Sequence, residues 1–242
     1  MKIIDANALF GFWPKRKVEI SLKRLLEMMQ QHKVEQSLSL STKGILYDYE
    51  EGNRETLEVS KKHPEIIPVA TVDLRKYFGK GKVIRKLARE GFKTLRLFPN
   101  LQNWPLNYQP FNQVVEEIKE TKLPLMISVT RLGGITEVGK AFSGCETAII
   151  LTSVNYGSFA EALAVMKRYR NVYIETSLFD TPDSYEIFVR ELGAERIIFG
   201  SYSPFHYFSS SFLPLERAEI SDKEKRLIAA ENIKRLLKDE NN

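Results

Sequence analysis

The residues that could do chemistry lie at or just after the ends of short β-rich runs. Most are hydroxyls and amides, and they are joined by two arginines, one aspartate, one glutamate and one histidine. Arginine binds anionic groups in two-pronged geometry, and hydroxyls orient such a ligand. Glutamate and histidine are the candidates for acid–base catalysis. The set is Asn7, Ser41, Thr42, Asp73, Arg96, Asn100, Ser128, Arg131, Ser153, Asn155, Glu175, Ser177, Tyr202 and His206.

The chain offers few ligands for a soft divalent metal. It has three histidines and one cysteine, Cys145. A catalytic zinc takes about three protein ligands, mostly imidazole, thiolate or carboxylate. His32 and His63 end helical stretches, so we expect them on the side of the fold that lies away from the strand C-termini. His206 alone among the histidines is expected near the other candidate residues.

Eight β-rich runs alternate with amphipathic helical stretches from one end of the chain to the other. The helical stretches carry apolar residues at the spacing of a helix with one buried face. Ser158 to Glu161 and Ser221 to Glu224 each predict a capping box at a helix start. The predicted strands are Lys2–Leu9, Gln36–Ser41, Ile66–Val72, Thr94–Phe98, Leu125–Val129, Ala148–Ser153, Val172–Ser177 and Arg196–Ser201.

This alternation predicts a parallel sheet, since each crossover between parallel strands needs a helix. Eight units in 242 residues fit a single-domain (β/α)8 TIM barrel over residues 1–242. A doubly wound open sheet is the competing fold. It is disfavoured because the turn after the first strand has one glycine, Gly11, where a dinucleotide-binding loop has several.

Three stretches resemble the amidohydrolase-2 family of metal-dependent TIM-barrel hydrolases and decarboxylases. Ile4–Leu9 is similar to the opening strand of that family, which reads I-D-x-H-x-H. Residues 196–204, RIIFGSYSP, resemble its last strand, R-I-L-F-G-S-D-x-P. Residues 231–237, ENIKRLL, resemble its closing helix. The resemblance implies a TIM barrel with its site at the C-terminal ends of the strands.

The resemblance also implies a metal centre, which the family builds from four histidines and one aspartate. In this sequence the five ligand positions fall on Asn7, Leu9, Ser128, Ser153 and Tyr202. None of these is an imidazole, a thiolate or a carboxylate, which a soft divalent metal prefers. The sequence therefore predicts that the metal centre of the family has been lost and that no other cofactor replaces it.

Three functions stay open at this point. In the first, the barrel binds a small anionic ligand through Asn7, Arg96, Ser128, Arg131, Ser153 and Tyr202. In the second, it is a metal-independent hydrolase, lactonase or decarboxylase with His206 or Glu175 as general base. In the third, Asp5, Asp73, Glu175 and His206 hold a metal of their own.

Composition excludes several classes of protein. The formal net charge is +5, and no basic stripe with interleaved aromatics indicates nucleic-acid binding. No apolar run reaches the ~18 residues of a membrane span. A single cysteine and an acidic residue at position 5 favour a cytoplasmic protein without a secretion signal. Residues 205–212 combine Phe205, Tyr207, Phe208 and Phe212 with three serines. They predict a flexible loop that covers a substrate or forms a homo-oligomer contact.

Overall fold

The computed structural model describes residues 1–15, 17–77 and 82–238. It contains eight parallel strands in sequential order, each paired with the next. The strands are β1 (Ile4–Phe10), β2 (Gln36–Ser41), β3 (Ile66–Thr71), β4 (Thr94–Leu97), β5 (Leu125–Ser128), β6 (Ile149–Thr152), β7 (Val172–Glu175) and β8 (Ile197–Ile198).

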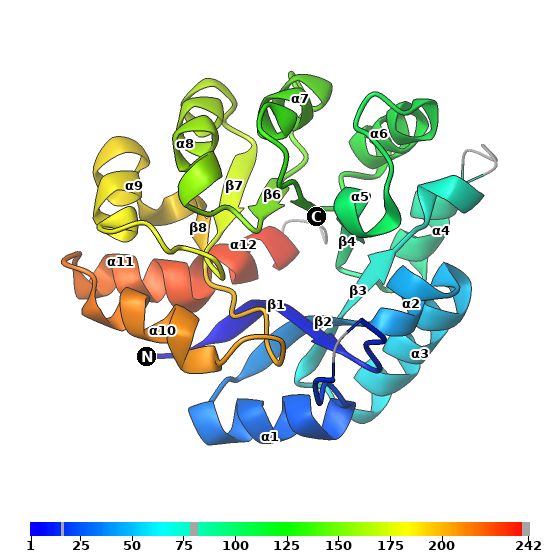
Figure 1. Ribbon diagram of the computed structural model, residues 1–242, viewed down its shortest axis with the longest axis horizontal. Coiled ribbons are helices and arrows are strands. Elements are labelled where there is room, and N and C mark those ends of the chain that lie inside the picture. Colours follow the sequence, from blue (N-terminus) through cyan, green and yellow to red (C-terminus); the bar gives the residue numbers. More distant parts are fainter. Residues whose placement is uncertain (16, 78–81, 239–242) are drawn as a thin grey trace.

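Helices surround the strands on the outside, as Figure 1 shows. They are α1 (Leu22–His32), α2 (Thr42–Leu46), α3 (Tyr49–Lys62), α4 (Val83–Arg89), α5 (Pro99–Gln102), α6 (Gln109–Thr121), α7 (Gly134–Ala141), α8 (Phe159–Arg168), α9 (Ser184–Leu192), α10 (Phe208–Arg217), α11 (Asp222–Arg226) and α12 (Asn232–Lys238), with short 3-10 turns at Leu74–Lys76, Tyr156–Ser158 and Ala194–Arg196. The predicted (β/α)8 barrel is confirmed.

The ring closes between the first strand and the segment that contains β8. The Ala6 amide donates to the Phe199 carbonyl at 3.0 Å, and the Leu9 amide donates to the Ser203 carbonyl at 3.1 Å. The expected eighth strand, Arg196–Ser201, is shortened to Ile197–Ile198. The chain beyond Ile198 still supplies carbonyls to the amides of β1, so this segment closes the barrel between β8 and β1.

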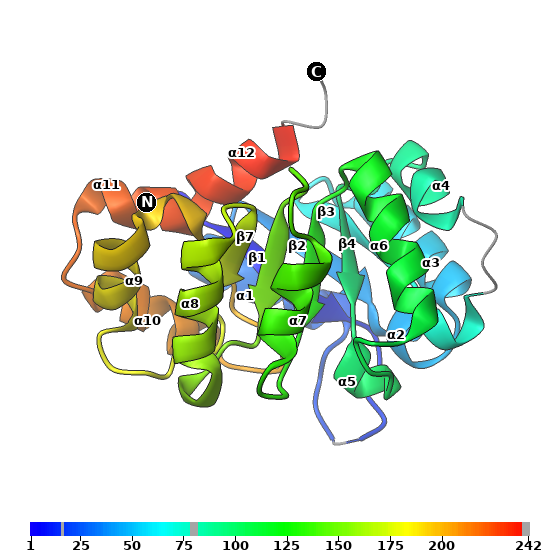
Figure 2. The ribbon, with the colours of Figure 1, turned by 90° about the horizontal axis from the view of Figure 1, so that it is seen from above.

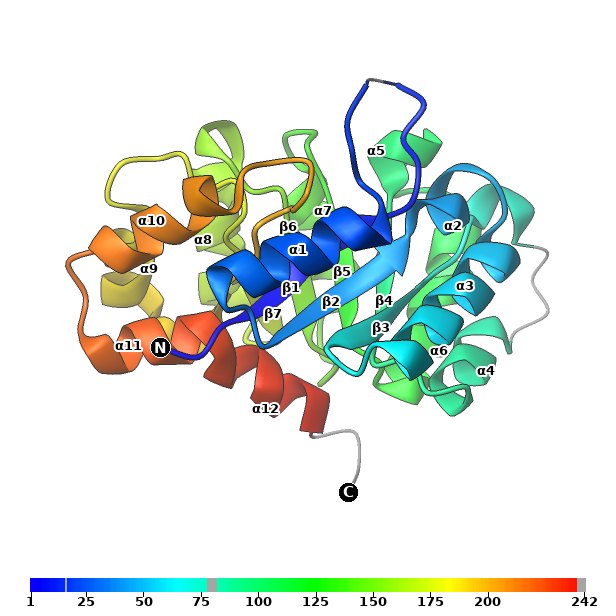
Figure 3. The ribbon, with the colours of Figure 1, turned by 90° about the horizontal axis from the view of Figure 1, so that it is seen from below.

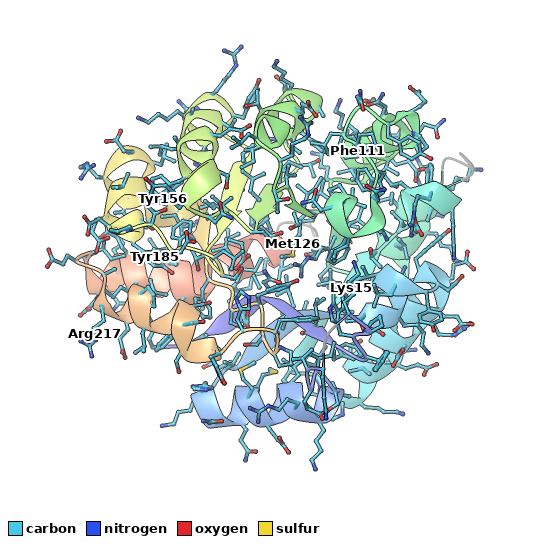
Figure 4. The ribbon with its side chains drawn as sticks, viewed as in Figure 1. Lys15, Phe111, Met126, Tyr156, Tyr185 and Arg217 are labelled. Carbon is cyan, nitrogen blue, oxygen red and sulfur yellow. The ribbon has the colours of Figure 1, made fainter. Side chains whose placement is uncertain are left out.

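Two apolar layers lie on the two faces of the strands. One fills the barrel and includes Leu40, Met126, Ile150 and Ile198. The other lies between the strands and the surrounding helices. Met126 is labelled near the middle of the molecule in Figure 4, in agreement with its complete burial. Strands that are apolar on both faces are typical of a parallel sheet covered by helices.

The two ends of the barrel are built differently. Helix α12 lies across one end, where Ile233 and Leu236 join the apolar layer inside the barrel. The Asn232 side chain fixes this helix, because its Nδ2 donates to the carbonyls of Ala194 and Ile197. Residues 11–15 and 17–21, between β1 and α1, stand out at the opposite end, to which the C-terminal ends of the strands point (Figures 2 and 3).

Two local predictions were wrong. Residues 208–212 are not a flexible loop but the start of α10, and Phe208 is buried against Phe199 with ring centroids 5.6 Å apart. Ser158 and Glu161 form no capping box, because Glu161 accepts from the backbone of Gly133 and Thr136 at the start of α7. The predicted Ser221–Glu224 box is confirmed.

No helix among the described residues has the length and apolarity to cross a bilayer.

Candidate functional site

Asn7 connects a buried arginine to a buried glutamate inside the barrel. Its Oδ1 accepts from Arg96 Nη1 at 2.7 Å, and its Nδ2 donates to Glu175 Oε2 at 2.8 Å. The three residues come from β1, β4 and β7. Asn7 and Glu175 are fully buried, and Arg96 is 2% exposed. The amide therefore joins a cation and an anion that lie on distant strands.

A bulge in β1 positions this amide. Asp5 pairs with Ser37 and Ala8 pairs with Ser39, so Ala6 and Asn7 together lie opposite a single residue of β2. A bulge of this kind re-aims side chains within a strand. Asp5 stabilises it, because its carboxylate accepts from the Asn7 amide at 3.0 Å and from the Ser201 amide at 2.9 Å.

The carboxylate of Glu175 is enclosed by hydrogen-bond donors and by backbone. Besides Asn7, it accepts from the Ser177 amide at 2.6 Å and from Ser177 Oγ at 2.9 Å. Gly200 lies directly against it, and a β-carbon at that position would overlap the carboxylate. Burial raises the pKa of Glu175 to about 7, although the bonds from Asn7 and Ser177 act in the opposite direction.

The Asp5 carboxylate has a smaller shift of the same sign. Burial raises its pKa to about 6, against the hydrogen bonds from Ser201 and Asn7 and the charge of Arg96. Asp5 and Glu175 both interact electrostatically with the Arg96 guanidinium. In the ionised state, the two carboxylates exceed the single positive charge of the cluster by one.

Arg96 is held by rings more than by hydrogen bonds. Its guanidinium carbon lies 4.8 Å from the ring centre of Phe98 and 6.0 Å from that of Tyr202. Burial lowers the pKa of Arg96, whereas Tyr202, Glu175 and Asp5 raise it. The buried Nε has no hydrogen-bond partner within the described part of the chain. A buried guanidinium with spare donors is equipped for one more anionic group.

A partly exposed layer lies at the C-terminal ends of β5, β6 and β8. Ser128 and Ser153 approach to 2.8 Å between their Oγ atoms. The Tyr202 ring stacks on Phe205 with centroids 5.2 Å apart and meets the edge of His206 at the same distance. Trp13 packs edge-on against Phe205 at 4.8 Å. Tyr202, which also faces the Arg96 guanidinium, therefore connects this layer to the buried cluster.

Other predicted site residues lie away from this cluster. Arg131 is exposed at the rim and pairs with Glu137 at 2.7 Å. Asp73 binds Arg75 through both of its oxygens. The remaining polar residues of the predicted set serve local structure: Ser41 caps α2, Thr42 binds the backbone of Phe12, Asn100 binds Thr130 and Asn155 caps a 3-10 turn.

Among the five residues that the sequence analysis aligned with the family's metal ligands, none is an imidazole, a thiolate or a carboxylate. Leu9 is apolar and fully buried, and the oxygen of Asn7 is already occupied by a guanidinium. A cation at this place repels a second one. Residues 1–15, 17–77 and 82–238 contain no group of three or more His, Cys, Asp or Glu side chains that could hold a metal ion.

Sequence reasoning missed three contributors to the site. Phe98 lies under the guanidinium, Ser201 binds Asp5, and Gly200 makes room for Glu175. Gly200 and Ser201 belong to the FGS motif that supplied the resemblance, so their spacing was visible in the sequence. Their partners were not visible, since Asp5 and Glu175 are separated from them by 25 residues or more along the chain.

The sequence matches the profile of the amidohydrolase-2 family, described as amidohydrolase, over residues 49–238. No curated protein sequence matches the chain. Several solved structures share its fold over 98% of this chain. They include a probable 2-pyrone-4,6-dicarboxylic acid hydrolase from Acinetobacter baumannii with citric acid bound (14% identity, 99% of that chain, TM-score 0.75).

Two decarboxylases are similar to the same extent. One is the 5-carboxyvanillate decarboxylase from Sphingomonas paucimobilis (15% identity, 98% of each chain, TM-score 0.74). The other is the 2,6-dihydroxybenzoate decarboxylase from Rhizobium (14% identity, 98% of each chain, TM-score 0.74). At these identities the likeness shows the fold.

Glu175→Gln is expected to flatten the dependence of stability on pH. With a pKa of about 7 in the folded chain and an ordinary value of 4.5, Glu175 keeps a proton that the unfolded chain has lost. The free energy of unfolding therefore falls as the pH rises from about 4.5 to about 7, by up to about 3 kcal/mol. Urea unfolding from pH 4.5 to 8 measures this slope.

The variant should lose Glu175's share of the slope and keep that of Asp5. Glu58→Gln, which replaces an exposed carboxylate, is the matched control and should keep the full slope. An unchanged slope in Glu175→Gln would show that this carboxyl holds no extra proton in the folded chain.

Proposed function

The chain belongs to the amidohydrolase-2 family, and we propose that in this member Arg96 takes the place of a metal ion as the cation that binds a small carboxylate. The observation that carries this proposal is the buried guanidinium of Arg96, which has an unsatisfied Nε and donates to Asn7. Asn7 is the residue that the sequence analysis aligned with the first histidine of the family. A metal centre has then been replaced by a fixed organic cation.

Charge supports this exchange. A divalent ion and a guanidinium both offer positive charge to an anionic ligand, but the guanidinium needs no ligand set of its own. In the interior its electrostatic effect is far larger than at the surface. Asp5 and Glu175 supply the counter-charge that an isolated buried arginine lacks. The cluster is therefore able to persist without a bound ion.

The proposed ligand class comes from the similar structures. Each of the two decarboxylases and the hydrolase is named after a compound with a carboxylate group, and the hydrolase structure contains citric acid. We place the carboxylate of the ligand toward Arg96 and Asn7. Ser128, Ser153 and Tyr202 then orient the rest of it by hydrogen bonds, and Arg131 attracts it at the rim.

Access to Arg96 runs through the aromatic layer. Tyr202 and Phe205 are each partly exposed, and they stack over the inner apolar core. Their displacement opens the way to the guanidinium, and an aromatic ligand can replace the stacking that is lost. Tyr202 has a positive φ of 55°. This conformation is uncommon for a bulky residue and marks the position as a special one in the loop.

The second candidate function is metal-independent catalysis, as a hydrolase, a lactonase or a decarboxylase. It is favoured by Glu175, because a carboxyl with a pKa of about 7 serves as acid or as base near neutrality. In a decarboxylation the bond to the carboxylate carbon breaks, carbon dioxide leaves, and the electron pair left behind takes the proton of Glu175. In a hydrolysis, Glu175 or His206 would instead remove a proton from the attacking water.

Carboxylate binding should depend on Arg96. Titration calorimetry with benzoate and with citrate is expected to detect binding to the wild type and a loss of at least ~10-fold in affinity for Arg96→Gln, since a hydrogen bond to a charged group contributes ~1.5–3 kcal/mol. Arg85→Gln removes an exposed arginine and serves as the control. Equal affinity of wild type and Arg96→Gln, with both folded by circular dichroism, would refute the assigned role.

Binding should also take up a proton. An anion bound next to Arg96 offsets the positive charge of the guanidinium and adds a negative charge near Glu175. Both effects raise the pKa of the Glu175 carboxyl further. At pH 7.5 to 8, where much of Glu175 is ionised, a fraction of a proton approaching one should be bound for each ligand, and affinity should fall as the pH rises. Calorimetry in buffers of different ionisation enthalpy measures this number. Its value in Glu175→Gln should be near zero.

If catalysis occurs, it should fail without Glu175. Assays of carbon dioxide release from 2,6-dihydroxybenzoate and of ester or lactone hydrolysis would supply the rates. Removal of a general acid or base is expected to cost ~100-fold or more in kcat. A rate that survives both Glu175→Gln and His206→Ala would exclude these two residues as the general acid or base. Carboxylate binding without turnover would show that the protein binds its ligand without catalysis.

A further inference from the structure

A cavity of about 560 Å³ lies beside the barrel, at the C-terminal ends of β1 and β2. Its volume is in the range of small-molecule sites. None of its lining residues belongs to the Arg96 cluster. They are Gly11, Phe12, Ser41, Thr42, Lys43, Leu46, Tyr47, Asp48, Glu51 and Glu55.

Two exposed aromatic side chains contribute to the walls of this cavity. Phe12 is 72% exposed and Tyr47 is 75% exposed, which is unusual for large rings that line a hollow. Thr42 fixes the backbone of Phe12, because its Oγ1 donates to the Phe12 carbonyl at 2.8 Å and accepts from the Phe12 amide at 3.0 Å. The walls are therefore anchored to helix α2, while their ring faces remain available to a ligand.

The charges around the cavity are mostly negative. Glu55 is occupied by Lys43 at 3.3 Å and by the Ser41 hydroxyl at 3.0 Å. Asp48 accepts from the amides of Glu50 and Glu51 at the start of α3 and pairs with Lys76 at 4.0 Å. The Glu51 side chain makes no ion pair or hydrogen bond with any residue that the structure describes. The cavity thus combines aromatic walls with a carboxylate that is free to take a positive charge.

We propose that this cavity binds a small organic ammonium ion that carries an apolar or aromatic body. The ammonium group pairs with Glu51, and the apolar body packs between Phe12 and Tyr47. Aromatic faces attract cations through their quadrupole as well as apolar surface. This site is separate from the carboxylate site of the barrel in both position and sign of charge, so it stands or falls independently of the proposed function.

Three ligands with one ring and different charge test this directly. Benzylammonium is the cationic probe, benzyl alcohol its neutral counterpart and benzoate its anionic one. Binding is followed by NMR on the full-length wild-type protein. We expect benzylammonium to shift resonances of residues 11–12 and 41–55, and benzyl alcohol to bind these residues at least ~3-fold more weakly. Absence of such shifts with benzylammonium at millimolar concentration, or equal affinity of all three ligands as followed at residues 11–12 and 41–55, would overturn the proposal.

Two variants with matched controls locate the site. Tyr47→Ala and Glu51→Gln should each weaken benzylammonium binding by ~2- to 5-fold. Tyr156→Ala removes an equally exposed ring elsewhere on the surface, and Glu50→Gln removes the neighbouring carboxylate that does not line the cavity. Both controls should keep wild-type affinity. The proposal is wrong if the controls lose affinity as strongly as the two cavity variants do.

Discussion

One buried cation determines the arrangement at the centre of this barrel. Arg96 is 2% exposed and cannot be deprotonated in a protein, so its charge must be balanced where it lies. Glu175 and Asp5 supply that balance from two other strands, and Asn7 connects the guanidinium to Glu175. The bulge in β1 and the small Gly200 follow from this need, because both create the space in which these groups meet.

Most of the fold was predictable from the sequence. All eight strands were found because buried parallel strands are short apolar runs, separated by stretches with helical periodicity. Their ends were less certain. Arg196–Ser201 yields only the two residues of β8, since the chain beyond Ile198 pairs through single hydrogen bonds to β1. The failed Ser158–Glu161 box has a similar cause, because Glu161 finds its donors in a neighbouring helix rather than in its own.

The grouping of some candidate residues was predictable from the sequence. Asn7, Arg96 and Glu175 were all predicted as candidate site residues because they lie near the ends of predicted strands. Parallel strands place such residues at one end of the barrel. Their depth could not be predicted, nor could the different place of Arg131, which lies exposed at the rim. Side-chain burial depends on what covers a residue. Arg96 is covered by Phe98, two residues further along the chain, and by Tyr202, which closure of the barrel brings from beyond β8.

The central claim is that a guanidinium occupies the place of a metal ion. It is tested most directly by measuring bound metal after the purified protein has been equilibrated with Zn²⁺ or Mn²⁺ and freed of unbound ions. The account predicts far less than one ion per chain and no anomalous scattering peak near Asn7. One ion per chain, within ligand distance of Asn7 or Glu175 and lost in Asn7→Ala, would contradict it.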